Sequence, residues 1–548
     1  MASIGLILLF VCSVLIASSC ASVFDKDEEL KLERYVDSFL GCRDVPGLGI
    51  AVVKDGESFS KGYGMADMEN QVPANSSTIF CLGSVTKSMT AMLLAKMISK
   101  REYKLSWTSK VKDVLGPEYT FNKDCITDYV TIADILSHRT GLVSADLLLQ
   151  AGVPASVTRE HQMKNLQYLP SLFEFRDTFY YNNLVYVLAA HMAEKRSQKS
   201  WEQLIQDELF KPLNMKSTVL LDTNYPQSLA VPYIIGKNGT LNVSDQRLYS
   251  IHPFGPAGSV CSSADDMTKW LKLITSEGKN ESGGSLIPNY IINKQFEPVS
   301  ALQALWTMAY SSQPSFPVKL DSYAYGYGWF IAYYRGHKLL HHAGSLYGYS
   351  CKIAYLPEIK SAFVFFINGP GELKFEESIY SMFYFLLDLV IGYTPWLNET
   401  TACTYPEPWR SGQHGRKRRQ TNTTKNFQTK IENIERYVGV YSNPLYGEVT
   451  FLTEEDNLLI KYGVLFDGTV TSTFSVELNA PLDEVLFNSV RLAFNDLSSD
   501  NKYNSVSMVS NLEKYSFTRV VDDANDSNNI KWSCASYVPI LISIIYLS

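Results

Sequence analysis

The tetrad Ser84-Val85-Thr86-Lys87 places a hydroxyl and an amine where they could act together in nucleophilic catalysis. Positions i and i+3 of a helix share one face, so the two side chains can meet. Removal of the serine proton by a neighbouring amine is one way to activate the hydroxyl for attack on a carbonyl carbon. The tetrad alone is a weak signal, because the chain holds at least four others, which begin at Ser58, Ser109, Ser276 and Ser499.

The setting of Ser84 distinguishes it from these other serines. The segment Thr78-Ile79-Phe80 leads into it, and a helix is predicted from Ser84 to Ile98 because apolar residues recur there at near-helical spacing. These apolar residues are Met89, Leu93, Leu94 and Met97. The N-terminus of such a helix offers backbone N–H groups and a positive dipole end to a developing oxyanion.

A tyrosine and an asparagine form a second candidate pair within Phe179-Tyr180-Tyr181-Asn182-Asn183. A tyrosine hydroxyl and an amide two residues further on could both point into one cleft. Tyr181 with Asn183 is the favoured register, and Tyr180 with Asn182 is the competing one. In isolation the segment would be interpreted as a strand or loop that packs a tyrosine.

A third candidate element is His341-His342-Ala343-Gly344-Ser345, at the end of a predicted strand. A glycine beside a histidine allows the backbone to approach a substrate carbonyl closely. Paired histidines on a strand are more often structural, so this element indicates a catalytic site only in combination with the other two.

Together the three elements resemble the serine beta-lactamase and penicillin-binding protein superfamily, and within it the class C-like branch with its esterases and D-aminopeptidases. The order and spacing of the elements agree, and the resemblance runs from about residue 28 to 395. Further segments match at 46–49, 135–142, 256–258, 265–267 and 325–329. The segment 437–441 resembles the start of the small β-domain that often follows such enzymes.

The resemblance implies roles for the candidate residues. Ser84 would be the nucleophile, and Lys87 would be its activating partner. Tyr181 would carry a proton between the serine and the leaving group, while Asn183 would hold Lys87 and contact the substrate. The reaction implied is acylation of Ser84 followed by hydrolysis with water, with no cofactor and no metal.

The strand that ends near His342 would complete this site. The backbone N–H groups of Ser84 and Ser345 would form the oxyanion hole. His342 lies where many beta-lactamases carry the lysine of Lys-Thr-Gly, and Ala343 replaces the usual threonine. Without that charge and that hydroxyl, β-lactam antibiotics are not the expected natural substrate. Whether catalysis is retained stays open, and the alternative is a catalytically silent extracellular matrix protein, of shell or cuticle type, on the same fold.

The elements that position these residues predict an α+β fold, an antiparallel sheet flanked by helices with an all-helical subdomain. Helices are predicted over residues 28–42 and 375–391 from their apolar periodicity. The predicted strands cover residues 47–53, 57–64, 328–334, 338–342, 351–356 and 361–368. Short alternating runs at 448–452, 458–462 and 469–476 then predict a small antiparallel β-barrel or sandwich domain.

The domain organisation follows from shifts in composition. Residues 1–21 are expected to be a signal peptide cut after Ala21, and residues 22–398 the beta-lactamase-like domain. Residues 399–430 form a polar linker whose run Arg416-Lys417-Arg418-Arg419 is either a solvated loop or a furin-type cleavage site. Residues 431–520 form the β-domain. The polar spacer and apolar tail at 521–548 resemble a GPI-attachment signal or are an ordinary chain end.

Two further features of the sequence matter if the chain is exported, its glycosylation sequons and its cysteines. Seven Asn-x-Ser/Thr glycosylation sequons occur, at Asn75, Asn238, Asn242, Asn280, Asn398, Asn422 and Asn525. Removal of both ends would leave six of the nine cysteines, which allow up to three disulfides in any of fifteen pairings. These six are Cys42, Cys81, Cys125, Cys261, Cys351 and Cys403.

Composition bounds the partners of this chain. Apolar residues make up 46% and charged residues 19%, a mixture typical of a globular protein with a large core. The net charge of −7 excludes a polycationic nucleic-acid binder. The leader and the sequons predict a secreted, extracellular protein, the resemblance implies a small-molecule or peptide substrate, and the charge predicts no nucleic-acid partner. Association with an extracellular matrix is a further expectation, and membrane attachment is expected only through a GPI anchor.

Overall fold

The computed structural model describes residues 22–221, 226, 228–236, 239–303, 318–371, 375–409, 431–471, 476–478, 490–510 and 513–521. Several expectations therefore lie outside the described residues: the leader 1–21, the basic run 416–419, the apolar tail, and the sequons at Asn238, Asn422 and Asn525. Within the described part of the chain, no helix is both long enough and apolar enough to cross a membrane.

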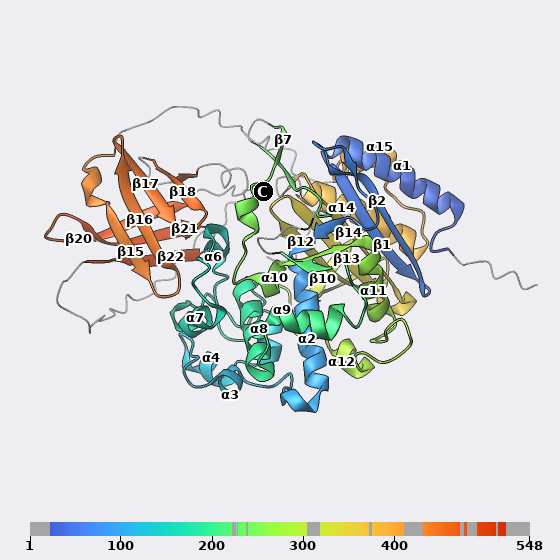
Figure 1. The fold of residues 1–548 in the computed structure, drawn as a ribbon, viewed down its shortest axis with the longest axis horizontal. Coiled ribbons are helices and arrows are strands. Elements are labelled where there is room, and N and C mark those ends of the chain that lie inside the picture. The colour runs from blue at the N-terminus through green and yellow to red at the C-terminus, as the bar shows by residue number, and fades with distance from the viewer. Residues whose placement is uncertain are drawn as a thin grey trace, which may run out of the picture.

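A nine-stranded antiparallel sheet forms the centre of the larger part of the molecule (Figure 1), in the order β3-β2-β1-β14-β13-β12-β11-β10-β9. Its strands are β1 Gly47–Lys54, β2 Glu57–Asp67, β3 Val72–Pro73, β9 Ser300–Ala301, β10 Leu320–Tyr325, β11 Phe330–Tyr334, β12 His337–Leu346, β13 Tyr349–Leu356 and β14 Ser361–Ile367. The first strand pairs with the last, with Leu48 opposite Ile367. The two ends of the domain therefore meet in the middle of the sheet.

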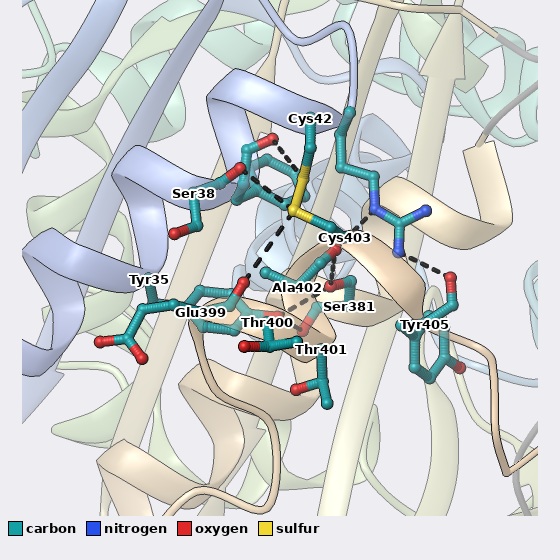
Figure 2. Close-up of a disulfide and its surroundings, with 12 residues drawn as sticks. Tyr35, Ser38, Cys42, Ser381, Glu399, Thr400, Thr401, Ala402, Cys403 and Tyr405 are labelled. Carbon is teal, nitrogen blue, oxygen red and sulfur yellow. Dashed lines mark hydrogen bonds between the residues drawn. A yellow bond between two sulfur atoms is a disulfide. The ribbon is translucent and has the colours of Figure 1, made fainter.

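Helices α1 (Lys26–Cys42) and α14 (Phe375–Ile391) cover one face of this sheet. Side chains alternate between the faces of a strand, so Ile50 and Val52 of β1 pack with these helices, while Ala51 and Val53 join the core on the other side. Helix α15 (Glu399–Thr404) lies beside α1, and the disulfide Cys42–Cys403 joins the two (Figure 2).

The other face of the sheet carries the helical subdomain, with α2 (Thr86–Ser99) at its centre. Every residue of α2 from Thr86 to Met97 is buried, as expected for a helix enclosed on all sides. The surrounding helices are α3 Val111–Leu115, α4 Asp124–Tyr129, α5 Ile132–Leu136, α6 Asp146–Ala151, α7 Arg159–Lys164, α8 Asn183–Ser197, α9 Trp201–Ile205, α10 Gly255–Gly258, α11 Ala264–Thr275 and α12 Asn289–Lys294.

Two small sheets complete the larger part. The strands β4 (Ile79–Cys81), β8 (Val260–Ser263) and β5 (Val219–Leu220) form one, and β6 (Tyr233–Ile235) pairs with β7 (Leu241–Val243) in the other.

An eight-stranded antiparallel sheet follows, in the order β19-β18-β17-β16-β15-β22-β21-β20. Its strands are β15 Gly439–Asn443, β16 Gly447–Glu454, β17 Asn457–Tyr462, β18 Phe466–Val470, β19 Val476–Leu478, β20 Arg491–Leu497, β21 Tyr503–Ser510 and β22 Glu513–Arg519. The sheet curls into a half-barrel around a core that includes Phe451, Ile460 and Phe517. The predicted α+β class with a C-terminal antiparallel β-domain is confirmed.

Several predicted element boundaries differ from the structure. The helix expected to begin at Ser84 begins at Thr86, because residues 83–85 form a tighter 3₁₀ turn. The run at 469–476 is not one strand, since β18 ends at Val470 and β19 starts at Val476. Strand β12 continues beyond its predicted end at His342 to Leu346, which places 343–345 inside the central sheet.

Two disulfides form among the six cysteines considered above, Cys42–Cys403 and Cys81–Cys261. Cys81 and Cys261 lie directly opposite each other in β4 and β8. Cys125 and Cys351 keep free thiols, the first exposed and the second buried. The maximum of three disulfides is therefore not reached.

Candidate active site

Ser84 lies at the centre of the 3₁₀ turn Gly83–Val85, between β4 and α2. The turn packs tightly against the end of β12, because two glycines leave no room for side chains. A Cβ on Gly344 would lie 1.9 Å from the Leu82 carbonyl oxygen, and one on Gly83 would lie 2.7 Å from the backbone nitrogen of Ser345. This close approach brings the backbone nitrogens of Ser84 and Ser345 to the same corner of the site.

Lys87 follows Ser84 on the first turn of α2 and is completely buried. Its Nζ donates to Ser84 Oγ at 3.0 Å, to Asn183 Oδ1 at 2.7 Å and to the Ala257 carbonyl oxygen at 2.9 Å. An ammonium group has three hydrogens to donate, so these acceptors fix the amine beside the serine hydroxyl.

Burial lowers the pKa of Lys87 to about 7, against a smaller raising effect from the charge of Asp146. Removal of the amine from water disfavours its charged form. Near neutral pH a substantial fraction of Lys87 is then neutral and can accept a proton from Ser84 Oγ, which suits a general base.

Asn183 begins α8 and lies between Lys87 and an acidic side chain. Its Oδ1 accepts from Lys87, and its Nδ2 donates to Asp146 Oδ1 at 2.9 Å. Asn182 is occupied elsewhere, because it caps α8 by accepting from the backbone nitrogens of Leu184 and Val185. The structure therefore brings Asn183 to Lys87 and uses Asn182 to start the helix.

The two tyrosines of this segment also have different surroundings, as the two asparagines do. The ring of Tyr181 lies 4.8 Å from Lys87 Nζ, measured to the ring centroid, and packs at 4.5 Å against the ring of His138. The Tyr180 hydroxyl instead donates to Glu513 at 3.0 Å. Tyr181 therefore lies with Ser84 and Lys87, and Tyr180 reaches the C-terminal sheet.

His342 lies on β12, buried beside Tyr181, with 6.2 Å between their ring centroids. Its Nδ1 lies 2.6 Å from the Ala343 carbonyl oxygen, which makes it the donor. Its Nε2 then accepts from the Tyr325 hydroxyl at 3.0 Å. Burial, helped by the charge of Lys87, lowers the pKa of His342 to about 3. The ring is neutral at physiological pH, so it does not supply the positive charge of a lysine.

A cavity of about 200 Å³ opens over these groups. Ser84, Asp146, Gln150, Asn183 and Ser345 are among its polar lining residues. The remaining lining residues are Leu149, Ile251, Phe254, Ala257, Gly258, Leu346 and Tyr347. The candidate nucleophile thus faces a small cavity of mixed polar and apolar lining, with a carboxylate at one side.

Two residues of the site were not identified from the sequence. Asp146 begins α6, and no motif surrounds it that would single it out. His138 belongs to the matched segment 135–142, which was the available signal, but no role was inferred for it. It is fully buried, its Nδ1 accepts from the backbone nitrogen of Asn182, and its ring packs on Tyr181.

The sequons within the described residues differ in exposure. Asn75 and Asn398 are exposed, whereas Asn242 and Asn280 are half-buried. Asn398 caps α15 by accepting from the backbone nitrogens of Thr400 and Thr401. Among the described residues, no group of three or more His, Cys, Asp or Glu side chains could hold a metal ion.

Comparison with known proteins gives one family. The model of the beta-lactamase family matches residues 32–381. An unguisins hydrolase of Aspergillus violaceofuscus (strain CBS 115571) is 28% identical over 374 residues, which cover 66% of this chain and 64% of that protein. The match thus spans slightly less than two thirds of that relative. Gigasin-6 of Magallana gigas is 26% identical over 240 residues, which cover 43% of this chain and 78% of gigasin-6.

Solved structures share the fold. The octameric penicillin-binding protein homologue from Pyrococcus abyssi superposes with a TM-score of 0.55 and 21% identity, covering 89% of this chain and all of that one (100%). The D-amino acid amidase from Ochrobactrum anthropi SV3 superposes with a TM-score of 0.54 and 19% identity, covering 67% of this chain and 98% of that one.

Proposed function

Since the chain belongs to the beta-lactamase family, we propose that it is a secreted serine hydrolase that cleaves an ester or amide through an acyl-enzyme at Ser84. The contact between Lys87 Nζ and Ser84 Oγ, at 3.0 Å, carries this proposal. It joins the nucleophile to a buried amine whose pKa lies at about 7, so the base required for acylation is available near neutral pH.

The proposed reaction proceeds in two steps. Neutral Lys87 accepts the proton of Ser84 Oγ as the oxygen attacks the substrate carbonyl carbon. The backbone N–H groups of Ser84 and Ser345 donate to the oxyanion that forms. As the C–O or C–N bond breaks, the Tyr181 hydroxyl donates its proton to the leaving alcohol or amine and takes up the proton held by Lys87, which becomes neutral again. Water then attacks the acyl-enzyme and gives a proton to neutral Lys87, the bond from the acyl carbon to Ser84 Oγ breaks, and Lys87 returns the proton to Ser84 Oγ as the acid product leaves.

The lining of the cavity favours a substrate without an acidic group near the reacting bond. His342 is neutral, Ala343 offers no hydroxyl, and Asp146 lines the cavity. A substrate carboxylate would therefore meet no free positive charge among the described lining residues and would lie near an acid. The printed names of two relatives, an unguisins hydrolase and a D-amino acid amidase, are consistent with a small-molecule or peptide amide.

A fluorophosphonate probe tests the nucleophile directly. Wild-type protein should be labelled between pH 7 and 9, and Ser84→Ala should abolish labelling. Ser58→Ala provides a matched control, because Ser58 is exposed and heads another Ser-x-x-Lys tetrad; its labelling should equal that of wild type. Absence of labelling in folded wild type across pH 6–9 would favour the silent extracellular matrix protein instead.

Export is the second part of the proposal. The two disulfides support it, because structural disulfides persist mainly in oxidising compartments. Expression in secretory cells should release protein whose N-terminus is Ser22 and whose mass falls on removal of N-linked glycans. Retention inside the cell with residues 1–21 intact would contradict this proposal. Mass analysis of the same sample would test cleavage at 416–419 and replacement of the tail by a GPI anchor.

A further inference from the structure

The carboxylate of Glu513 is buried where the C-terminal sheet meets the helical subdomain, with only 5% of the residue exposed. It begins β22 and makes three hydrogen bonds. Its Oε1 accepts from the backbone nitrogen of Ser144 at 2.5 Å and from the Tyr180 hydroxyl at 3.0 Å. Its Oε2 accepts from the Tyr515 hydroxyl at 2.5 Å. Two of these donors belong to the larger domain, and each lies close in sequence to a residue of the candidate site.

An unbroken series of polar contacts leads from Glu513 to the catalytic amine. The hydroxyl of Ser144 hydrogen-bonds to the side chain of Asp146. Asp146 Oδ1 accepts from Asn183 Nδ2 at 2.9 Å, and Asn183 Oδ1 accepts from Lys87 Nζ at 2.7 Å. Hydrogen-bonded networks in a buried setting hold their members more firmly than isolated pairs. A second connection runs through Tyr180, whose neighbour in the chain is Tyr181.

The sheet is packed directly against the helix that forms one wall of the cavity. The backbone nitrogens of Val464 and Leu465 donate to the carbonyl oxygen of Ala151, at the end of α6, at 2.9 and 2.8 Å. A Cβ on Gly463 would lie 2.4 Å from the same oxygen, so only glycine allows this approach. Figure 1 shows α6 lying beside this sheet. Other residues of the same helix, Asp146 and Leu149, line the catalytic cavity.

Glu513 places a carboxylate, and not a neutral side chain, in a buried position. Among the described residues, no cation forms an ion pair with it, so a negative charge is buried against neutral donors only. Burial of an unpaired charge opposes folding. A glutamine would keep one acceptor oxygen for the Ser144 nitrogen and the Tyr180 hydroxyl, while its Nε2 could only donate to the Tyr515 hydroxyl. Glutamine would therefore remove the charge and keep the two hydrogen bonds to the larger domain.

We infer that the C-terminal sheet completes the active site, with Glu513 as a positioning residue that holds the Ser144–Asp146 and Tyr180–Tyr181 segments for the reaction. This inference rests on the proposed hydrolase function. It gives the C-terminal sheet, in which the sequence shows no catalytic motif, a direct part in setting the geometry and the charge around Lys87.

The charge of Glu513 also affects the pKa of Lys87, through its effect on Asp146. Burial raises the pKa of Asp146, and the charge of Glu513 raises it further, while Lys87 lowers it. Asp146 in turn raises the pKa of Lys87. The other titratable side chains that face this amine are His138 and His342, both neutral, and the rings of Tyr181 and Tyr186. Loss of the Glu513 charge should leave Asp146 more fully ionised and keep Lys87 protonated to a higher pH.

The variant Glu513→Gln in the full chain tests this inference through the rate of inactivation by a fluorophosphonate probe from pH 5 to 10. We expect the acid limb of the profile to move to higher pH. The inactivation rate should fall by at least about threefold at pH 7 and by less above pH 9. A rise of one full unit in the pKa of Lys87 would lower the rate on the acid limb by about tenfold. Glu454→Gln is the matched control, since Glu454 is exposed on β16 of the same sheet; its profile should equal that of wild type.

An unchanged profile in Glu513→Gln, or an equal loss at every pH, would overturn the inference, because a purely structural role predicts no change in the midpoint. If Glu513→Gln does not fold, Glu513→Asp replaces it, keeping the charge but shortening the reach. That variant should lose rate while its midpoint stays at the wild-type pH, and an unchanged rate would overturn the inference. Failure of wild-type protein to react at Ser84 would instead reject the hydrolase proposal itself.

Discussion

At the scale of single residues, the site depends on the balance between burial and hydrogen bonding at Lys87. Three acceptors hold its amine, yet removal from water lowers its pKa to about 7. The acceptors favour a fixed position, and the burial favours a neutral base. Burial also keeps His342 neutral, so Lys87 and His342, which both lie beside Tyr181, carry different charges between their pKa values of about 7 and about 3.

Replacement of Lys87 by methionine should reduce fluorophosphonate labelling of Ser84 by about 10² to 10⁴, because a positioned general base contributes a factor of that order. The wild-type rate should rise with pH through a midpoint near the Lys87 pKa of about 7, since only the neutral amine accepts the proton. Lys100→Met is the control, because Lys100 follows the same helix but pairs with Glu208. A flat wild-type profile across pH 5–9 would contradict this role.

Tyr181→Phe should lower turnover of an ester substrate far more than Tyr180→Phe does. The Tyr181 ring lies over Lys87 Nζ, whereas the Tyr180 hydroxyl donates to Glu513. A loss of about 10²-fold or more is expected for Tyr181→Phe from removal of the proton carrier. Steady-state kinetics of both variants on one p-nitrophenyl ester provide the comparison, and equal losses would reject the assigned register.

At the scale of elements, the site forms where three of them meet: the start of α2, the start of α8 and the end of β12. Each supplies a different kind of group, respectively the proposed nucleophile with its base, the amide that contacts this base, and a backbone N–H group. Their separation is set by backbone contacts, and the contact between β12 and the nucleophile turn is the tightest of these. The proposed oxyanion hole would therefore depend on strand packing and not on any side chain.

Gly344→Ala should separate β12 from the nucleophile turn, because the new Cβ would lie 1.9 Å from the Leu82 carbonyl oxygen. Forced overpacking of this kind costs about 1 to 3 kcal/mol of unfolding free energy, and probe labelling should fall with it. Gly41→Ala is the control, since Gly41 lies in α1 with no atom within 4 Å of its added Cβ. Thermal unfolding and labelling rates measure both effects, and wild-type values for Gly344→Ala would refute the argument.

At the scale of the whole molecule, covalent and non-covalent links hold distant parts of the chain together. The disulfide Cys42–Cys403 joins residues separated by 361 positions and fixes α15 against α1 (Figure 2). Arg43 strengthens the same junction, because its guanidinium donates to the carbonyl oxygens of Ala402 and Tyr405 at 2.7 and 2.6 Å. On the opposite side of the central sheet, Glu513 and the 463–465 turn join the C-terminal sheet to the cavity wall.

Removal of this disulfide by Cys42→Ser with Cys403→Ser should lower the free energy of unfolding by about 2 to 5 kcal/mol, because the link closes a very long loop. Labelling of Ser84 at 25 °C should be unchanged, since the disulfide lies on the face of the sheet away from the site. Cys125→Ser is the control, as its thiol is exposed and unpaired. Equal melting temperatures for wild type and the double variant would contradict the expected stabilisation.

The sequence by itself determined the fold class and the candidates for the main chemistry. Short-range patterns encode these: the i, i+3 spacing of Ser84 and Lys87, the apolar periodicity of α2 and the alternation along β16 and β17. Such patterns depend on local backbone geometry, which is the same in any protein. The choice of Tyr181 with Asn183 also agrees with the placement of these side chains beside Lys87.

Only the tertiary structure decided which distant groups share the site and in which charge state. Asp146 and His138 stand in no catalytic motif, yet folding brings Asp146 to Asn183 and His138 to Tyr181 from separate elements. Glu513 comes from the C-terminal sheet and contacts Ser144 and Tyr180, which neighbour the site. The cysteine pairing and the neutral state of His342 were likewise undetermined by the sequence. The physical reason is that burial, desolvation and close backbone approach arise from contacts between residues far apart in the chain, and no local pattern records them.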